Sequence, residues 1–161
     1  MASAPAWSET SELKSPEVKP PRTLALGLSY LGVQVRYFFV PKWAGEVKYQ
    51  FGTVNSDGGN TTSQVIGLRG YRFFDTGTAY RLYLGGEASA VNSRDKQDGV
   101  FYRATGTALG AFGGFEYTIS KHWTLGLDIG PYLFSLKNNV VGGSDASLDF
   151  VANGAVSYYF R

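Results

Sequence analysis

The segment Leu148–Arg161 constrains the fold most, because its side chains alternate between two kinds. One face of the segment is apolar, and the other is mostly polar, with Val151 as an apolar exception. The apolar face takes every second position back from the end: Phe160, Tyr158, Val156, Gly154, Ala152, Phe150 and Leu148. A period of two is the spacing of a β-strand, since successive side chains point to opposite faces. The segment is therefore predicted to be a strand with one apolar and one polar face.

This strand ends in an aromatic cluster, and Phe160 stands one position from the last residue. The pattern resembles the C-terminal strand of bacterial outer-membrane β-barrels, whose final residue is typically Phe, with apolar residues at alternate positions before it. Arg161 departs from that pattern, because it follows the aromatic residue. The resemblance implies that the whole chain is built from strands of this kind.

The same alternation recurs from Thr23 onward and predicts further strands. They cover residues 24–30, 33–40, 47–53, 64–74, 80–90, 109–119 and 123–130. Short and long connections alternate between them. The short ones are PKWAG (41–45), DTGT (75–78) and SKH (120–122), and the long ones are residues 55–63, 92–104 and 138–147. Short turns at one end and longer loops at the other are typical of outer-membrane barrels.

Aromatic residues gather beside every short connection and at the C-terminus, in clusters that also contain Phe38, Phe73 and Tyr159. In a barrel these clusters lie at one level, as an interfacial aromatic girdle requires. The predicted girdle consists of Phe39, Trp43, Phe74, Tyr80, Tyr117, Trp123, Tyr158 and Phe160. The alternative is chance clustering in an aromatic-rich chain.

The strand count depends on residues 24–40. Bacterial single-chain barrels have even strand numbers, and the other segments with 33–40 amount to seven. We therefore expect 24–30 to be a separate first strand, joined by a very tight turn near Leu31-Gly32. A single long strand with a bulge over 24–40 is the competing interpretation.

The polar faces of the predicted strands carry charges of both signs. They are Arg36, Glu46, Lys48, Arg69, Arg81, Glu87, Glu116, Asp128 and Asp149. Buried charges need partners, so a nearly balanced set inside a narrow barrel is predicted to form a salt-bridge network that fills the lumen. The alternative is a small water-filled channel or ligand cavity, with space left by Gly110, Gly114, Gly126 and Gly130.

Over residues 24–160 the sequence resembles the small outer-membrane barrel family typified by OmpA and OmpX. The resemblance implies an all-β, antiparallel up-and-down transmembrane barrel of about eight strands. It also implies a non-enzymatic structural, adhesive or envelope-interaction role. The alternative is a soluble ligand-binding barrel of the lipocalin or avidin type, which would turn its apolar faces inward and its charges to water.

Residues 1–22 hold several Pro residues among Ser, Glu and Lys, and Trp7 is their only aromatic residue. This composition predicts a flexible tail before a barrel domain at 23–161. The tail lacks the apolar core of roughly 7–15 residues that a signal peptide needs. We interpret Met1 as an added start on a mature outer-membrane chain, the alternative being a cytosolic protein. Outer-membrane lipid is the expected partner, with a second envelope protein bound through the tail or the external loops.

Other function classes have little support in the sequence. A net charge of +2 does not argue for nucleic acid binding. There is no Cys, and neither a metal-ligand cluster nor a nucleotide-binding motif is present, so no cofactor is expected. The barrel enzymes that modify lipid A use a His placed with Ser, Asp or Glu in the outer half of the barrel. His122 lies on a predicted short turn at the other end, where a polar girdle residue is expected, so no catalytic residue is assigned.

Overall fold

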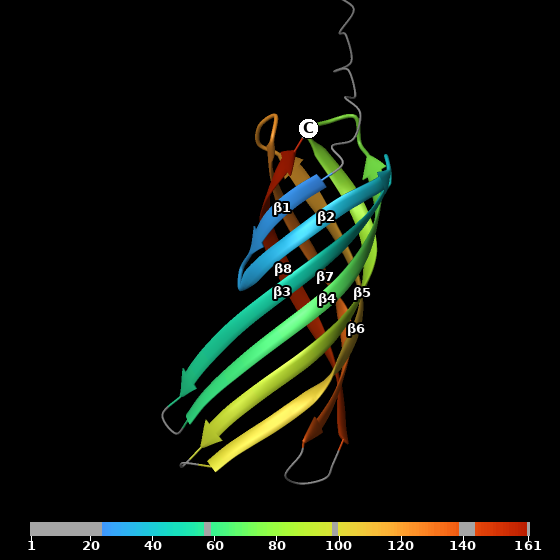
Figure 1. Cartoon of the computed structure of the whole chain (residues 1–161). Coiled ribbons are helices and arrows are strands. Elements are labelled where there is room, and N and C mark those ends of the chain that lie inside the picture. Colours follow the sequence, from blue (N-terminus) through green and yellow to red (C-terminus); the bar gives the residue numbers. More distant parts are fainter. Residues whose placement is uncertain (1–23, 57–58, 98–99, 139–143, 161) are drawn as a thin grey trace, which may run out of the picture.

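The computed structural model describes residues 24–56, 59–97, 100–138 and 144–160. In this part of the chain the elements are β1 (Leu24–Ser29), β2 (Gly32–Val40), β3 (Trp43–Ser56), β4 (Gly59–Asp75), β5 (Tyr80–Gln97), β6 (Val100–Thr118), β7 (Trp123–Asn138) and β8 (Ser144–Phe160). Each strand pairs antiparallel with the next, and β8 pairs with β1 to close the barrel (Figure 1). The predicted up-and-down barrel of eight strands is confirmed.

The first seventeen described residues form two strands, as the even strand count requires. Ser29 of β1 is the direct partner of Gly32 of β2, and Tyr30 and Leu31 make the turn between them. A side chain at Gly32 would place its Cβ 1.9 Å from the carbonyl oxygen of Tyr49 on β3. Only glycine therefore fits at this turn, and the single bulged strand is excluded.

The strands are strongly tilted because their register is staggered around the barrel. The line of direct partners that starts at Leu148 on β8 returns to β8 at Tyr158, ten residues further along. It passes through Leu133, Leu109, Ala88, Leu68, Val47, Val35 and Leu26. A stagger of this size in an eight-stranded barrel goes with a strand tilt of roughly 35–45°. One residue then advances about 2.5 Å along the barrel axis.

Alternate side chains point into and out of the barrel, and the two faces differ in chemistry. The buried inward side chains include seven charged residues: Arg36, Glu46, Lys48, Arg69, Glu87, Glu116 and Asp128. The outward side chains are large, apolar and exposed, as with Leu84 (59%), Ile129 (60%) and Leu68 (62%). The core of this protein therefore lies in the lumen, and its outer surface is apolar.

Apart from the β1–β2 turn, three connections lie at each end of the barrel. The turns β2–β3, β4–β5 and β6–β7 are short and lie at the end where β8 finishes, which we call the short-turn end (Figure 1). Gly77, in the β4–β5 turn, has a φ of +71°, a backbone conformation that favours glycine. The hairpins β3–β4, β5–β6 and β7–β8 extend to the opposite end, which we call the hairpin end.

The sequence predicted loops at the hairpin end that are too long. Residues 92–104 were expected to be a loop, but β5 continues to Gln97 and β6 starts at Val100. Direct pairing runs without a break from Asn92↔Thr105 to Gln97↔Val100. The predicted loop 55–63 is likewise mostly strand, and so is half of the predicted loop 138–147. These segments show no regular alternation of polarity, so nothing in the sequence indicates that the backbone ladder continues through them.

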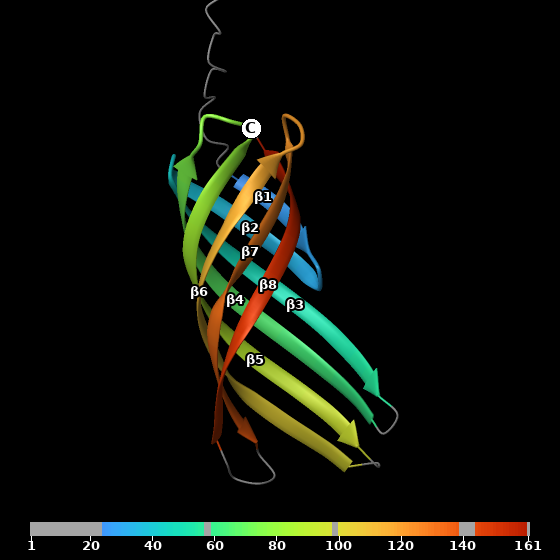
Figure 2. The same cartoon turned by 180° about the vertical axis from the view of Figure 1, so that it is seen from behind.

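The wall of the barrel is lower on one side, because β1 and β2 are short. The pairing of β2 with β3 ends at Gln50, and the pairing of β1 with β8 ends at Ala155. From these points toward the hairpin end, β3 and β8 have no strand paired to these edges in the described part of the chain. The strands β4–β8 reach much further in that direction than β1 and β2 (Figure 2).

Candidate functional site: the charged lumen and the outer surface

Acids and bases alternate along a chain of ion pairs inside the barrel. Arg81 Nη2 lies 2.6 Å from Glu116 Oε1, and the other oxygen of Glu116 lies 2.7 Å from Arg36 Nη1. Arg36 Nε lies 2.9 Å from Glu46 Oε2, whose Oε1 is 3.6 Å from Arg69 Nη1. These five residues come from five different strands, so the chain of charges ties the wall together across the lumen.

The chain branches at Arg69 toward the hairpin end. Arg69 Nη2 donates to Asp128 Oδ1 at 2.9 Å, and Arg69 Nε lies 3.2 Å from Glu87 Oε2. Lys48 Nζ completes the branch, 2.7 Å from Glu87 Oε1. All side chains of the network are at most 6% exposed except Arg81, at 25%. Buried charges of this kind are stable only when paired, and each acid here has a base within reach.

Each acid of the network also accepts a hydrogen bond from a tyrosine hydroxyl. The donors come from four strands. They pair as Tyr71 with Glu46 (2.7 Å), Tyr132 with Glu87 (2.8 Å), Tyr159 with Glu116 (2.7 Å) and Tyr83 with Asp128 (3.2 Å). Ser89 also donates to Glu87, and Asn153 donates to Asp128 at 2.9 Å. These bonds satisfy carboxylate oxygens that the bases alone leave open.

The sequence did not identify these four tyrosines as site residues. The signal is their parity, because Tyr71 is two positions from Arg69 and Tyr83 is two positions from Arg81. Residues two apart on a strand share a face. Tyr132 and Tyr159 were harder to assign, since neighbouring positions on their strands are aromatic or apolar too.

Aromatic rings fill the space between the charges. The guanidinium of Arg36 lies 4.4 Å from the ring centre of Tyr71, and that of Arg69 lies 3.8 Å from the ring centre of Phe112. Both are cation–π contacts in a desolvated setting. The ring of Tyr132 covers Gly110, where an added Cβ would lie 2.5 Å from ring carbons. The ring of a residue on a neighbouring strand thus fills the space beside this glycine. A water-filled channel would need that space to be open.

A small polar cavity lies between the network and the β1–β2 hairpin. Its volume is about 10 Å³, close to what one water molecule needs. Its lining includes Ser29, Gln34, Lys48 and Asn153. The Ser29 hydroxyl is buried and has no hydrogen-bond partner among the described residues. A single water is the occupant that this volume and this polarity fit.

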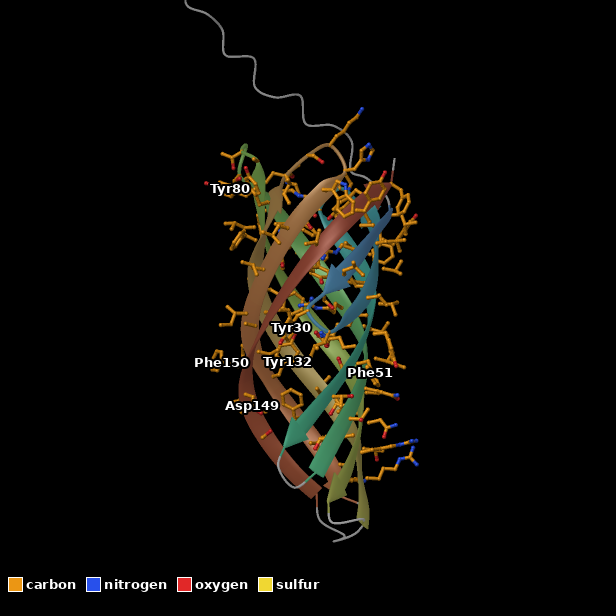
Figure 3. The ribbon with its side chains drawn as sticks, turned by 90° about the vertical axis from the view of Figure 1, so that its left-hand side faces the viewer. Tyr30, Phe51, Tyr80, Tyr132, Asp149 and Phe150 are labelled. Carbon is orange, nitrogen blue, oxygen red and sulfur yellow. The ribbon has the colours of Figure 1, made fainter. Side chains whose placement is uncertain are left out.

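Asp149 is the one predicted lumen charge that does not join the network. It has the inward parity of β8 and is the direct partner of Tyr132, but its side chain is exposed. Its hydrogen-bond donor is the hydroxyl of Ser147, at 3.1 Å. Asp149 lies toward the hairpin end, beyond the point where β1 stops pairing with β8 (Figure 3). With β7 on one side and no paired strand on the other, the carboxylate faces solvent instead of a base.

The eight predicted girdle residues all point outward near the short-turn end. Seven are exposed and Tyr158 is half-buried. Figure 3 shows Tyr80 at this end and Phe150 on the outer surface about midway along the barrel. Trp123 and Phe160 each make an edge-to-face contact with Tyr158, and Arg72 lies over Trp43 at 5.6 Å.

Three aromatic residues of the same sequence clusters face inward instead. Phe38, Phe73 and Tyr159 are each at most 3% exposed and pack together, with Phe38 5.2 Å from Phe73 and 6.0 Å from Tyr159. Their parity differs by one from that of the girdle residues beside them, which turns them to the opposite face. They close the short-turn end of the lumen.

His122 contacts the backbone and a ring. Its Nδ1 lies 3.0 Å from the carbonyl oxygen of Tyr159, and its ring stacks on Tyr158 at 5.3 Å. Neither contact supplies a nucleophile or an acid. Over residues 24–56, 59–97, 100–138 and 144–160, no group of three or more potential metal ligands was found. The same residues contain no helix long and apolar enough to cross a membrane.

No protein-family model matches the sequence, and no curated protein matches it. The structure is similar to the crystal structure of Neisserial surface protein A (NspA), with a TM-score of 0.58, 18% sequence identity and coverage of 85% of this chain and 93% of NspA. It is equally similar to the N-terminal β-barrel domain of Pseudomonas aeruginosa OprF, with a TM-score of 0.58, 14% identity and coverage of 85% and 93%. The chain therefore has the fold of the small outer-membrane β-barrels, as its sequence predicted.

Proposed function

We propose that the protein is an integral outer-membrane barrel with a filled lumen and a non-enzymatic role in structure or partner binding. The observation that carries the proposal is the apolar band on its outer surface. On β7 the band runs from Trp123 to Leu133, before Ser135 and Lys137. At about 2.5 Å per residue this stretch is about 25 Å tall, the height of the apolar band of outer-membrane barrels.

The distribution of side chains excludes a soluble barrel of the lipocalin or avidin type. Such a barrel would turn its apolar side chains inward to a ligand and its charges outward. Here Leu127, Ile129 and Leu133 are exposed, while Arg36 and Glu46 are buried in the lumen. In water this surface would be an apolar belt around the whole molecule, far larger than monomeric soluble proteins expose.

A filled lumen is supported by the ion-pair chain and by the rings around it. Buried charges that are paired hold their positions, because moving one would leave its partner unpaired. The cavity beside Gln34 and Lys48 has room for about one water molecule, so it does not make a path along the axis. The proposal therefore assigns no transport role to the lumen.

Partner binding is assigned to the hairpin end. The hairpins β3–β4, β5–β6 and β7–β8 continue past the apolar band with polar residues on their outer face, including Thr62, Gln64 and Arg94. These extensions are paired strands, and a rigid projecting wall of this kind suits the binding of another envelope or external protein. The N-terminal tail, the other predicted binding segment, lies outside the described residues.

Two measurements on the full chain test the proposal. After refolding into phosphatidylcholine vesicles, the unheated protein should migrate differently from the boiled protein on a gel and resist extraction by carbonate. A protein that stays in the aqueous phase would overturn the membrane assignment. In planar bilayers, the inserted barrel should show no stable conductance steps. Regular open-channel steps would overturn the filled lumen while leaving the membrane assignment intact.

A further inference from the structure

Three basic residues lie close together on the outer surface just past the apolar band. They are Arg94 on β5, Arg103 on β6 and Lys137 on β7, and all three are exposed. Their strands are neighbours, because β6 pairs with both β5 and β7. All three share the outward parity of the apolar residues further along the same strands, such as Leu84, Leu109 and Leu133. We call these three residues the basic patch.

The register brings the charges of the patch close to one another. Arg94 and Arg103 are direct cross-strand partners, which places their Cβ atoms about 4.5–5.5 Å apart. Lys137 is the direct partner of Thr105, the next outward residue of β6 after Arg103, so it lies diagonal to Arg103 at about 7–8 Å. Like charges directly opposite each other destabilise a sheet. An anion bound between them removes that repulsion.

No acid on the outer surface compensates the patch within the described residues. The neighbouring outward positions with described side chains are uncharged: Thr62, Gln64, Asn92, Thr105, Thr107 and Ser135. None of the ion pairs formed by the described residues involves Arg94, Arg103 or Lys137. The patch is thus a local excess of positive charge, in a protein that pairs every acid of its lumen network.

The level of the patch matches that of lipid headgroups. On β5 the apolar outward residues end at Ala90, and on β7 they end at Leu133, four positions before Arg94 and Lys137 respectively. Four residues of a tilted strand advance about 10 Å along the axis. Long basic side chains reach back several ångström toward an apolar boundary, and the headgroup region extends roughly 5–8 Å beyond the hydrocarbon core. The charged groups therefore lie where lipid phosphates lie.

We propose that the basic patch binds the phosphate groups of a lipid headgroup in the leaflet at the hairpin end. This proposal rests on the membrane assignment made above and names the lipid chemistry that the outer surface recognises. The two guanidinium groups each present a fork of N–H donors that fits phosphate oxygens, and Lys137 adds a point charge. The hydroxyls of Thr105 and Thr107 stand on the same face of β6, as further donors beside the cations.

The test measures lipid binding to the full chain, folded in nonionic detergent, by native mass spectrometry. The probe is diphosphorylated lipid A, with phosphatidylcholine as the reference lipid. The patch variant is Arg94→Gln, Arg103→Gln and Lys137→Gln together. The control variant is Lys42→Gln, Arg72→Gln and Lys121→Gln, which removes three exposed cations at the short-turn end and so changes the net charge equally.

The parent should prefer lipid A, and the patch variant should bind it roughly a hundredfold more weakly, at about fivefold for each cation lost near a membrane surface. The control variant should stay within about twofold of the parent. Equal losses in both variants would show a net-charge effect and overturn the site. Competition by inorganic phosphate at the same concentration as lipid A, or tighter patch-dependent binding of polyglutamate, would also overturn the headgroup as the occupant.

The repulsion between the cations of the patch allows a second test, in which one substitution shifts the urea midpoint in opposite directions in two lipids. Arg103→Gln should raise the urea midpoint of unfolding in phosphatidylcholine vesicles, because it relieves the contact with Arg94. In vesicles containing lipid A the same change should lower the midpoint. The same sign in both lipids would contradict phosphate binding at the patch. Failure of the parent to insert into either vesicle would overturn the membrane assignment itself, which separates the two proposals.

Discussion

The two halves of the lumen treat similar acidic residues in opposite ways. Toward the short-turn end, Glu116 is buried, pairs with Arg36 and Arg81 and accepts from Tyr159. Toward the hairpin end, Asp149 has the same inward parity but is exposed, and its side-chain donor among the described residues is the Ser147 hydroxyl. The residue types are alike and so is the strand geometry. The difference is the wall around them, which is complete beside Glu116 and missing two strands beside Asp149.

This contrast shows that enclosure decides which charges need partners. Where all eight strands are present, water cannot reach the carboxylate, and the barrel supplies bases, tyrosine hydroxyls and rings in its place. Beyond the β1–β2 turn, water solvates the carboxylate, and no partner from the protein is required. The structure therefore concentrates its polar packing in the part of the lumen that the wall encloses.

The largest expected effect separates these two acids. Glu116→Leu should destabilise the folded barrel by roughly 3–5 kcal/mol, because it leaves Arg81 and part of Arg36 as buried charges without a partner. The matched change Asp149→Leu should cost within about 0.5 kcal/mol, as for an exposed site. The measurement is urea unfolding in phosphatidylcholine vesicles followed by tryptophan fluorescence. Equal costs at the two sites would show that both halves of the lumen are equally open.

The outer surface allows the same comparison between its middle and its edge. Leu127→Arg places a charge near the middle of the apolar band and should cost about 2–4 kcal/mol in vesicles. Leu148→Arg, near the hairpin end of the band, should cost about 0–1 kcal/mol. Both residues are exposed leucines on neighbouring strands, so each controls for the other. A Leu127→Arg barrel as stable as the parent would contradict the assignment of the outward face to lipid.

Much of this architecture could be predicted from the sequence, because a period of two is visible wherever one face meets lipid and the other meets the lumen. The sequence could therefore predict that Leu125 and Leu127 face the opposite side from Asp128. It could also predict that Trp123 and Tyr158 lie at one level along the barrel axis. Residues 92–104 carried no such signal, since they show no regular alternation of polarity, and the strand extensions were missed.

The partners inside the lumen were less predictable than the charges. Parity places Arg36 and Glu116 on inward faces, but they contact each other across the barrel, 80 positions apart in sequence. Such pairing depends on shear and register, which no local pattern contains. The exposure of Asp149 depended on the length of β1 and β2, which the sequence left open between one strand and two.

A small effect is expected at His122. His122→Ala removes the ring that contacts the Tyr159 carbonyl and stacks on Tyr158, which should cost about 1 kcal/mol. The protein should bind its lipids and insert into vesicles as before. A lipid-hydrolysing or acyl-transfer activity that is present in the parent and lost in this variant would contradict the non-enzymatic assignment.

The measurement that tests the central claim most directly is a double-mutant cycle between Arg81 and Glu116, by urea unfolding in vesicles. In the structure Arg81 ends the ion-pair chain, and Glu116 is the acid it contacts. Glu116→Leu leaves Arg81 with no counter-charge, so adding Arg81→Leu should recover about 1–3 kcal/mol of the lost stability. The double variant is therefore predicted to be more stable than Glu116→Leu alone. Additive losses with no coupling, in a barrel that still folds, would contradict a lumen held shut by paired charges.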